Sequence, residues 1–441
     1  MKKKLQLTNS FGIKALTIFV LCAFINSQYV DAQVRLASSE PVKLDKEICI
    51  YKPDPNPVRS FIPVQSAVKA RMDSNTSDSR TIITGSCATF DVTYTGFTAA
   101  AESAFTYAVQ IWANTIVSTE TIKIDANFGP LDPGVLGGAG PALYYLLTGP
   151  GIPADTLFPS ALTDALTGGD ADPSGSDIDA SFSSTASFYF GTDGMTPGGQ
   201  YDFVSVVLHE IGHGLGIAGF GREQLDMDDN PTGLGELRLS GQYVSIWDQY
   251  IENGSDTSIL TFTDPSVALL GQFTGGDLFS NGPETTSQNG SVNPEMYAPN
   301  PFESGSSYSH WDEASYPAGH PNSLMTPQIG MGEAIHDPGV VTLGFMFDMF
   351  WSICGNLLST PEVAANELFN YYPNPVKTNI SLITQNIIDD ITIFNMLGQQ
   401  IIQSKPNDLE STIDLTELQG GAYFMQVTIG NTTKTVKVLK N

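Results

Sequence analysis

The chain has 441 residues, which exceeds one ordinary domain and allows a sizeable core. Its formal net charge is −27, and this acidity argues against binding to nucleic acids or to anionic membranes, which require basic surface. Only 15% of the residues are charged, so the solvent-exposed surface must rely on Ser, Thr, Asn and Gly, as is common in secreted proteins.

The first segment, Met1–Ala32, has the three parts of a secretory signal peptide. Three lysines follow Met1, the apolar run Ala15–Ile25 is too short to span a bilayer, and Val30–Ala32 offers a cleavage site. Cys22 would fit a lipoprotein signal only after a small residue, and Leu21 is not small. No later apolar run approaches the roughly 20 residues of a spanning helix, so we expect an exported chain without a transmembrane segment.

Residues 33–80 are polar, show no clear periodicity and are predicted to form a pro-segment or N-terminal extension. Their cysteine, Cys49, leaves two interpretations open. Its thiolate could occupy the open position of a metal site and keep an enzyme latent as a zymogen. Alternatively, it could form a disulfide with Cys87 or Cys354, since three cysteines remain after the signal peptide is removed.

An α/β lobe is predicted to begin near residue 86. Phe90–Thr95 and Ile122–Phe128 alternate apolar and polar residues, as half-buried strands do. Between them, Thr98 can cap a helix that runs to Ile116 with its apolar residues on one side. A passage rich in Gly and Pro follows, over residues 129–175.

An acidic cluster lies before the next predicted strand, and it comprises Asp170, Asp172, Asp177 and Asp179. Its carboxylates could bind Ca²⁺, but they lack the fixed spacing of a known calcium loop, so a solvated acidic turn is the alternative. Ala180–Tyr189 could then form an edge strand on which an extended peptide would lie by strand addition.

The stretch YDFVSVVLHEIGHGLG carries the strongest chemical signal in the chain. On a helix, residues four apart share a face, so His209 and His213 can direct both imidazoles at one metal ion. Glu210 lies beside them, where a carboxylate can deprotonate a water molecule at the metal. This HExxH spacing is the zinc-peptidase signature. The apolar residues around it predict a buried helix, and Asp202 is a suitable N-cap.

A catalytic zinc ion needs a third protein ligand. His310 is the preferred candidate; His320 lies in a turn, and His336 precedes an Asp-Pro helix-start signature and is expected to be structural or exposed. Glu236 remains a further candidate, because some helical zinc peptidases use a downstream glutamate. Residues 220–309 are too long for one structureless loop, and we expect them to carry short strands beside the cleft.

The motifs HEIGHGLG, SSYSHWDE and NSLMTP together resemble the leishmanolysin-like branch of the metzincin metallopeptidases. Most metzincins place the third histidine six residues after the second, where this chain has Gly219. The leishmanolysin-like branch has a long insertion before that histidine, which matches His310. Met325 then matches the methionine of the Met-turn beneath the metal, and Pro327 stands where a tyrosine ligand of the astacin kind would be.

The resemblance covers residues 81–354 and implies an α+β fold class: a mixed sheet plus active-site helix in a zinc metallopeptidase domain at residues 81–358. Pro338–Ile353 would be its terminal helix. With this topology, a Cys87–Cys354 disulfide would tie the first strand to that helix and leave Cys49 free. One catalytic Zn²⁺ is the implied cofactor.

After a linker at residues 359–369, residues 370–441 predict a small all-β sandwich from short alternating strands and turn pairs such as Asn374-Pro375 and Gly420-Gly421. The order YPNP, NMLGQ, L-x-x-G-x-Y-x-x-x-V and a lysine-rich end resembles the C-terminal sorting domain of type IX secretion cargo. This resemblance implies the type IX machinery as a partner and a secreted or cell-surface location.

Two functions from different classes follow from these patterns. The first is a secreted zinc endopeptidase acting on protein or peptide substrates, with Glu210 as general base. The alternative is a non-enzymatic surface adhesin or binding protein on a metallopeptidase scaffold. The intact HExxH pattern argues against this alternative, because a binding protein has no need of a base beside its metal.

Overall fold

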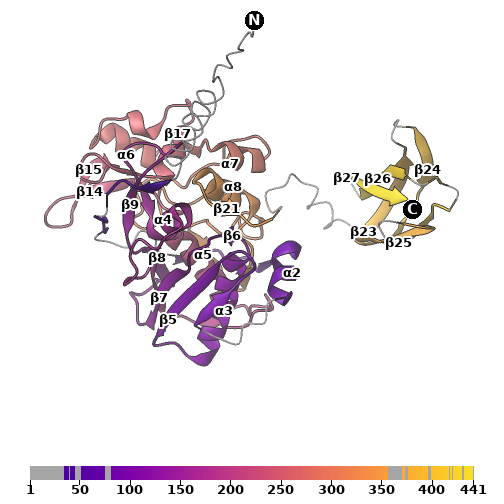
Figure 1. Ribbon diagram of the computed structural model, residues 1–441, viewed down its shortest axis with the longest axis horizontal. Coiled ribbons are helices and arrows are strands. Elements are labelled where there is room, and N and C mark those ends of the chain that lie inside the picture. Colours follow the sequence, from indigo (N-terminus) through magenta and orange to yellow (C-terminus); the bar gives the residue numbers. More distant parts are fainter. Residues whose placement is uncertain are drawn as a thin grey trace, which may run out of the picture. The chain divides into compact units, whose positions relative to one another are not determined.

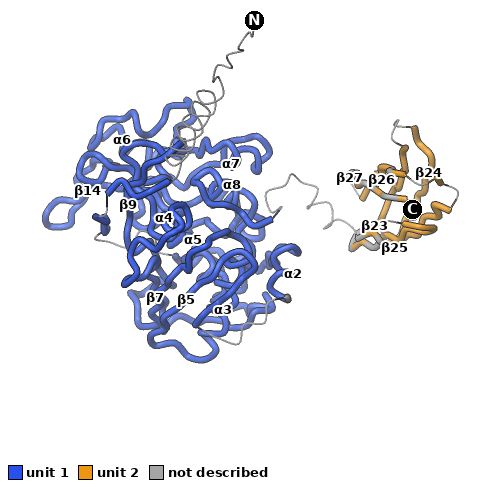
Figure 2. Tube along the Cα trace, in the orientation of Figure 1, with its two compact units in different colours: residues 1–357 blue, residues 358–441 orange. Residues whose placement is uncertain are grey.

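The computed structural model describes residues 34–38, 40–44, 51–74, 81–355, 370–372, 376–395, 399–416, 418–419, 421–429 and 432–440. The chain divides into two compact units, residues 1–357 and residues 358–441 (Figure 2). Both units are built mostly from strands, and the few described helices all lie in the first unit, so the described chain is of mixed α and β composition. The expected signal peptide, the linker and Cys49 lie outside the described residues.

A five-stranded sheet organises the first unit (Figure 1). Its strands, in spatial order, are β4 (Ile82–Thr84), β5 (Thr89–Thr95), β7 (Ile122–Gly129), β11 (Ile178–Ser183) and β8 (Gly137–Pro141). The three inner strands are parallel, and the two edge strands are antiparallel to their neighbours. The predicted strands at residues 90–95 and 122–128 are therefore confirmed as β5 and β7.

Helix α3 (Ala99–Ala113) connects these two strands. Its N-cap is Thr98, as predicted, whose hydroxyl oxygen accepts a hydrogen bond from the Ala101 N–H at 3.2 Å. The prediction that the helix continues to Ile116 is wrong. The chain leaves the helix after Ala113, because residues 116–117 form strand β6, which pairs with β21 (Ser352–Ile353).

The predicted edge strand at Ala180–Tyr189 is also wrong. Its first part belongs to β11, which is enclosed by β7 on one side and β8 on the other. The edge is instead β8, with the sequence GGAGP. Glycine fits there without displacing a neighbour, because a Cβ atom on Gly137 would lie 3.0 Å from the Phe182 ring and 3.3 Å from Glu210 Cγ. A strand without β-branched residues gives no recognisable strand pattern.

The last helix of the first unit is shorter than expected. Helix α8 spans Val340–Asp348 rather than Pro338–Ile353. Phe350, with φ of 80°, has a left-handed backbone that cannot continue a helix, and β21 follows. A disulfide joins Cys87 to Cys354 and so links the start of β5 to the end of this unit.

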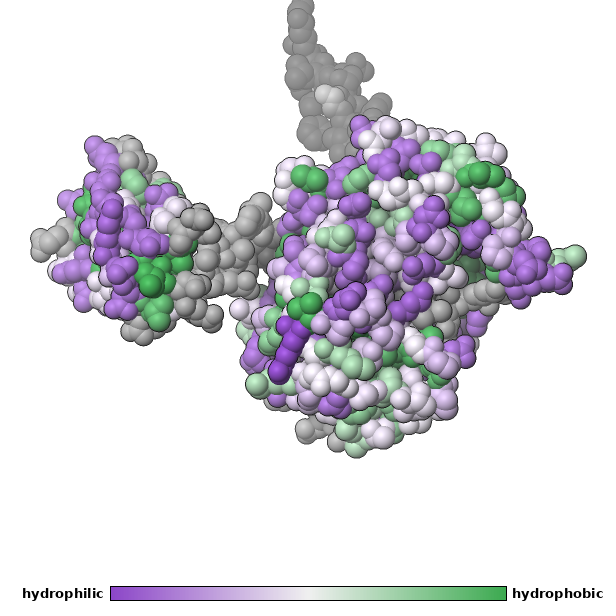
Figure 3. All heavy atoms as spheres, turned by 180° about the vertical axis from the view of Figure 1, so that it is seen from behind, coloured by the Kyte–Doolittle hydropathy of each residue, from purple (hydrophilic) through white to green (hydrophobic). Residues whose placement is uncertain are grey.

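Residues 220–309 are not one loop but a series of short elements, as expected. They comprise β14 (Arg222–Leu225), β15 (Pro231–Glu236), β16 (Val244–Ser245), η1 (Trp247–Tyr250), β17 (Ile251–Asn253), η2 (Ile259–Thr261), α6 (Val267–Phe273), β18 (Leu278–Ser280) and α7 (Pro283–Gln288). The β14–β15 hairpin projects from the unit in Figure 1. Its tip, residues 226–230, is an exposed acidic turn, and the same projection is mostly hydrophilic in Figure 3.

The N-terminal extension is attached to this unit along its described length. It contributes β1 (Arg35–Leu36), β2 (Lys52–Pro53), β3 (Ser60–Ile62) and α2 (Ser66–Ser74). These strands pair with β9, β19 and β20 respectively, and α2 packs against α3. Strands of two or three residues are too short to produce a periodic pattern, which is why the sequence gives no sign of them.

The remaining elements of the first unit are short. They are β9 (Tyr144–Thr148), β10 (Thr156–Pro159), α4 (Ser160–Thr167), β12 (Phe188–Tyr189), β13 (Tyr201–Asp202), α5 (Phe203–Gly214), β19 (Gln328–Ile329) and β20 (Glu333–Ile335). No helix in the described part of the chain is long and apolar enough to cross a membrane.

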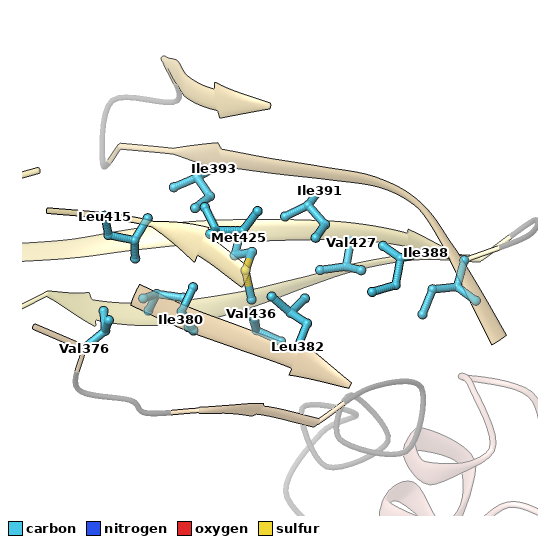
Figure 4. Close-up of a cluster of buried hydrophobic side chains, with 13 residues drawn as sticks. Val376, Ile380, Leu382, Ile388, Ile391, Ile393, Leu415, Met425, Val427 and Val436 are labelled. Carbon is cyan, nitrogen blue, oxygen red and sulfur yellow. The ribbon is translucent and has the colours of Figure 1, made fainter. Parts of the chain in front are cut away.

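The second unit is an all-β arrangement around one long strand. Its strands are β22 (Asn370–Tyr372), β23 (Asn379–Phe394), β24 (Gln400–Ser404), β25 (Asp408–Asp414), β26 (Gly421–Ile429) and β27 (Thr432–Lys440). The first half of β23 pairs with β22 and β25, and its second half pairs with β24 and β26. Buried Ile, Leu, Val and Met side chains from these strands point toward one another and form the core (Figure 4).

Candidate metal centre

Helix α5 carries the HExxH motif and is buried along its whole length. Asp202 caps it, as predicted, by accepting a hydrogen bond from the Ser205 N–H at 3.1 Å. The helix packs against α3, β8 and β11. Two tryptophans fix its C-terminal half: Trp112 Nε1–H donates to the Leu208 carbonyl at 3.0 Å, and Trp351 Nε1–H donates to the Leu215 carbonyl at 2.9 Å.

Three histidines converge at this helix. The Nε2 atoms of His209 and His213 are 3.0 Å apart, and His310 Nε2 lies 3.2 Å from that of His213 and 3.3 Å from that of His209. All three side chains are fully buried. Within the described residues, they form the one group of three or more His, Cys, Asp or Glu residues whose potential ligand atoms lie together.

Each of these imidazoles is oriented by a backbone carbonyl. The Nδ1–H of His209 donates to the carbonyl oxygen of Leu324 at 2.6 Å. In the same way, His213 donates to the carbonyl oxygen of Ile217 at 2.5 Å, and His310 donates to that of Ser306 at 2.6 Å. A carbonyl oxygen can only accept, so Nδ1 carries the proton and the Nε2 lone pair of every ring faces the common point. Backbone partners of this kind fix the tautomer and the ring orientation of metal-binding histidines.

Burial also keeps the three rings neutral. It lowers the pKa of His213 to about 4. The pKa values of His209 and His310 lie well below their usual range, first because of burial and then because neighbouring imidazoles disfavour a further charge. Neutral imidazole is the form that binds a metal ion.

The donor set fits a zinc ion. A tetrahedral site with zinc–nitrogen bonds of about 2.05 Å separates its nitrogen atoms by about 3.3 Å. The three observed separations, 3.0 to 3.3 Å, are close to this value. Three neutral nitrogen donors from the protein are a ligand set found at catalytic zinc sites.

The glutamate of the motif faces the edge of the sheet. Glu210 is fully buried on α5, and its Cγ lies 3.3 Å from the Cβ position of Gly137 in β8. A side chain larger than hydrogen at residue 137 would therefore press on this carboxylate arm. The edge strand and the candidate general base are thus adjacent, although 73 residues separate them in the sequence.

Met325 lies directly against the metal-binding helix. Its side chain is fully buried, and its sulfur is 3.1 Å from where a Cβ atom on Gly212 would stand. The preceding residue, Leu324, supplies the carbonyl that orients His209. Gly212 therefore provides the space in which the methionine sulfur contacts the helix between the two histidines.

At position 219, six residues after His213, aromatic rings from elsewhere in the chain fill the space that a side chain would take. A Cβ atom on Gly219 would lie 2.2 Å from the Tyr308 ring and 2.5 Å from the Trp247 ring. Only glycine fits at this position. The third imidazole comes instead from His310, two residues after the tyrosine that fills this space.

The other candidate ligands lie outside the histidine group. His336 is buried at the beginning of α5, where its Nε2–H donates to the Asp202 carboxylate at 3.1 Å. His320 accepts a hydrogen bond at Nδ1 from the Asn322 N–H in a turn. Glu236 forms an ion pair with Arg222 at 3.0 Å across the β14–β15 hairpin.

The acidic cluster before β11 forms an ion pair with a lysine side chain, Lys123. Lys123 Nζ lies 2.5 Å from Asp170 Oδ2, and the Lys123 N–H donates to Asp177 at 2.8 Å. Burial raises the pKa of Asp177 to about 6 and that of Asp164, which interacts with this cluster, to about 7. These aspartates belong to no described group with metal-ligand geometry.

Tyr51 is the residue at the centre that the sequence did not single out. Its ring lies parallel to the His209 ring, with centroids 3.6 Å apart and planes inclined by 6°. Its backbone forms an antiparallel bridge to β8: Tyr51 N–H donates to the Gly137 carbonyl, and Leu136 N–H donates to the Tyr51 carbonyl, both at 3.2 Å. A lone tyrosine in a polar segment carries no pattern that could have predicted this position.

Comparison with known proteins identifies the second unit. Residues 370–441 match the family described as the secretion system C-terminal sorting domain. No curated protein matches the chain. One similar solved structure is PorZ, described as an essential bacterial surface component of the type-IX secretion system of Porphyromonas gingivalis. It is 13% identical with a TM-score of 0.15, covering 21% of this chain and 14% of PorZ, so the likeness carries no argument.

The sorting-domain match determines where the protein is found. A chain with this C-terminal domain is exported by type IX secretion to the exterior or to the cell surface. The secreted or cell-surface location predicted from the sequence is thereby confirmed.

Proposed function

We propose that residues 81–357 form a zinc-dependent endopeptidase, a hydrolase that cleaves peptide bonds in proteins or peptides outside the cell. The observation that carries the proposal is the convergence of three neutral imidazole Nε2 atoms, 3.0 to 3.3 Å apart, beside a glutamate on the same buried helix. A purely structural core would avoid this arrangement, because three neutral imidazoles grouped in this way have their Nε2 lone pairs facing one another without a hydrogen-bond donor.

His209, His213 and His310 would hold the zinc ion. When bound, zinc supplies a Lewis acid that polarises a carbonyl group and lowers the pKa of water to about 7. Glu210 would accept the proton of the attacking water molecule and return it to the amine that leaves. Its position next to β8 supports this role, since a peptide held at that edge would present its scissile bond close to the carboxylate.

The fold of the first unit supports a metzincin-type assignment. A five-stranded sheet with antiparallel edge strands lies against the helix that carries HExxH, and Met325 lies under that helix. A substrate would then bind in extended form by adding to β8, with backbone hydrogen bonds giving affinity. For the second unit, the two groups of strands around β23 support a small sandwich that associates with the type IX secretion machinery.

The N-terminal extension would keep this enzyme as a zymogen. Tyr51 bridges to β8 at Gly137, residues 52–53 pair with β19, and Lys52 forms an ion pair with Glu303 at 3.6 Å. An edge strand can accept only one partner on its open side. While Tyr51 is paired with Gly137, a substrate cannot use the same backbone groups, so the extension must be displaced or removed before catalysis.

Two measurements on the mature secreted protein test the proposal. We expect one zinc ion per chain and digestion of casein. Glu210→Gln should retain the zinc ion and lose digestion, because the amide keeps the shape of the side chain but cannot accept the proton.

Glu210→Gln protein that still digests casein would contradict the mechanism. A chain that binds zinc but cleaves no protein in a broad substrate panel would favour the adhesin alternative. A chain that binds no zinc would refute the metal centre itself.

A further inference from the structure

The third histidine needs an anchor that the helix cannot supply. His209 and His213 are fixed relative to each other by one turn of α5, but His310 follows His213 by 97 residues. Its Nδ1–H donates to Ser306, which lies in its own loop. The loop at residues 306–310 must therefore be fixed to the rest of the centre by other contacts.

A buried carboxylate connects this loop to the metal-binding helix. Asp248 lies in η1 and is fully buried. Its Oδ1 accepts hydrogen bonds from the Tyr308 hydroxyl at 2.8 Å and from the Phe220 N–H at 3.1 Å, and its Oδ2 accepts one from the Ser245 N–H at 2.7 Å. One side chain thus joins the segment after α5, the insertion and the loop of the third histidine.

The backbone of Tyr308 gives an independent sign of constraint. Its φ of 74° is in the left-handed region, which is unfavourable for a bulky residue and persists only where surrounding contacts enforce it. The fully buried ring lies over Gly219 and Gly221 and contacts the Phe273 ring at 4.8 Å between centroids. The Gly219 N–H also donates to the Ser309 hydroxyl at 3.1 Å.

We propose that Asp248, acting through the Tyr308 hydroxyl, is the positioning residue that holds His310 in the histidine triad. Asp248 touches no reacting atom; it fixes the course of the chain immediately before the ligand. Gly219 contributes to the same positioning of His310, because the lack of a side chain there makes room for the Tyr308 ring. This inference rests on the proposed zinc function.

The test compares Tyr308→Phe with wild type in the full chain. Tyr308→Phe keeps the ring packing and removes only the hydroxyl group that Asp248 accepts from. Zinc affinity is measured by competition with a chelator, and the visible absorption of the Co²⁺-substituted protein reports the coordination geometry. We expect a 10- to 100-fold loss of zinc affinity, as for other outer-shell partners of metal ligands, and an altered Co²⁺ spectrum.

Tyr316→Phe is the matched control, because it also removes one hydroxyl from a buried tyrosine, whose hydrogen bond goes to Asn289 at 2.9 Å. This control should leave zinc affinity and the Co²⁺ spectrum unchanged. A purely structural role of Tyr308 would lower the melting temperature of the metal-free protein without changing the spectrum, and that result would overturn the inference.

The outcomes also separate this inference from the proposed function. Failure of the wild-type chain to bind zinc refutes the metal centre, and the inference with it. Zinc binding by wild type with unchanged binding by Tyr308→Phe refutes the positioning role alone. If Tyr308→Phe does not fold, Asp248→Asn is measured in the same way; failure of both to fold would show a general role in the fold and overturn the inference.

Discussion

The phenol ring of Tyr51 is stacked on the imidazole ring of His209, with 3.6 Å between their centroids. Tyr51 belongs to the N-terminal extension and His209 to the metal-binding helix, so this contact joins the segment expected to confer latency directly to the candidate centre. Because the ring is fully buried, its contribution to holding the extension in place must be large.

Tyr51→Ala should therefore increase proteolytic activity of the chain that retains its extension. Truncating a buried aromatic residue removes about 3–5 kcal/mol of packing, and each 1.4 kcal/mol is tenfold in an equilibrium. We expect at least about a tenfold faster initial rate of casein digestion. Val58→Ala is the control on the same extension, since Val58 is 55% exposed and should have no effect. Equal rates for wild type and Tyr51→Ala would argue that the stacking does not restrain the enzyme.

His310→Ala should weaken zinc binding by more than the roughly 100-fold that loss of an outer-shell partner costs, because it removes a ligand. His320→Ala should leave the zinc affinity unchanged, since His320 lies outside the histidine group. The zinc affinity is measured by competition with a chelator, after which the metal content of the purified chain is determined. Equal affinities of the two variants would show that His310 is not the third ligand.

Asp164 should contribute stability that is lost as the pH rises from about 4 to about 7. Burial, followed by the nearby carboxylates of Asp177 and Asp170, raises its pKa from the usual 3.8 to about 7. The folded protein thus binds this proton more tightly than the unfolded chain. Its stabilising contribution is complete below pH 3.8 and is lost as the pH rises through 7.

Asp164→Asn removes this dependence but keeps an oxygen that accepts from the Ala171 N–H at 2.9 Å. We expect its free energy of unfolding at pH 8 to exceed that of wild type by on the order of 1 kcal/mol. Urea unfolding curves between pH 4 and pH 8 give the free energy of unfolding of both proteins and its dependence on pH. Parallel pH profiles for the two proteins would exclude Asp164 as the group responsible.

Gly219→Ala and Gly271→Ala should change stability in opposite directions. A methyl group at residue 219 would lie 2.2 Å from the Tyr308 ring, whereas nothing lies within 4 Å of the equivalent position at residue 271 in α6. Overpacking costs about 1–3 kcal/mol, and alanine inside a helix gains roughly 0.5–1 kcal/mol over glycine. Thermal unfolding measures the stability of the two variants. A neutral effect at residue 219 would mean that the rings of Tyr308 and Trp247 can move apart.

Local chemistry made much of the site predictable. HExxH places two imidazoles and a carboxylate on a helix by spacing alone, and Asp202 and Thr98 cap their helices because a short oxygen-bearing side chain can bond to free N–H groups nearby. The alternation in residues 90–95 and 122–128 likewise reported the two strands directly. Each of these features depends on residues close together in the sequence.

The errors lie where distant segments decide the outcome. Residues 180–183 look like an edge strand in isolation, but whether a strand is at an edge depends on which other strand reaches it, and glycine-rich β8 does. Helix α3 ends at Ala113 because residues 116–117 pair with Ser352 and Ile353 from the far end of the unit. No local pattern records such pairings.

By itself, the sequence determined that this chain is exported, that it ends in a sorting domain, and that one helix presents a pair of histidines with a glutamate. It also narrowed the third histidine to a few candidates. Tertiary structure alone decided that His310 joins them, that Gly219 makes room for Tyr308, and that Tyr51 stacks on His209. These contacts span tens to hundreds of residues, and the packing that selects them arises only when the insertion and the N-terminal extension close around the helix.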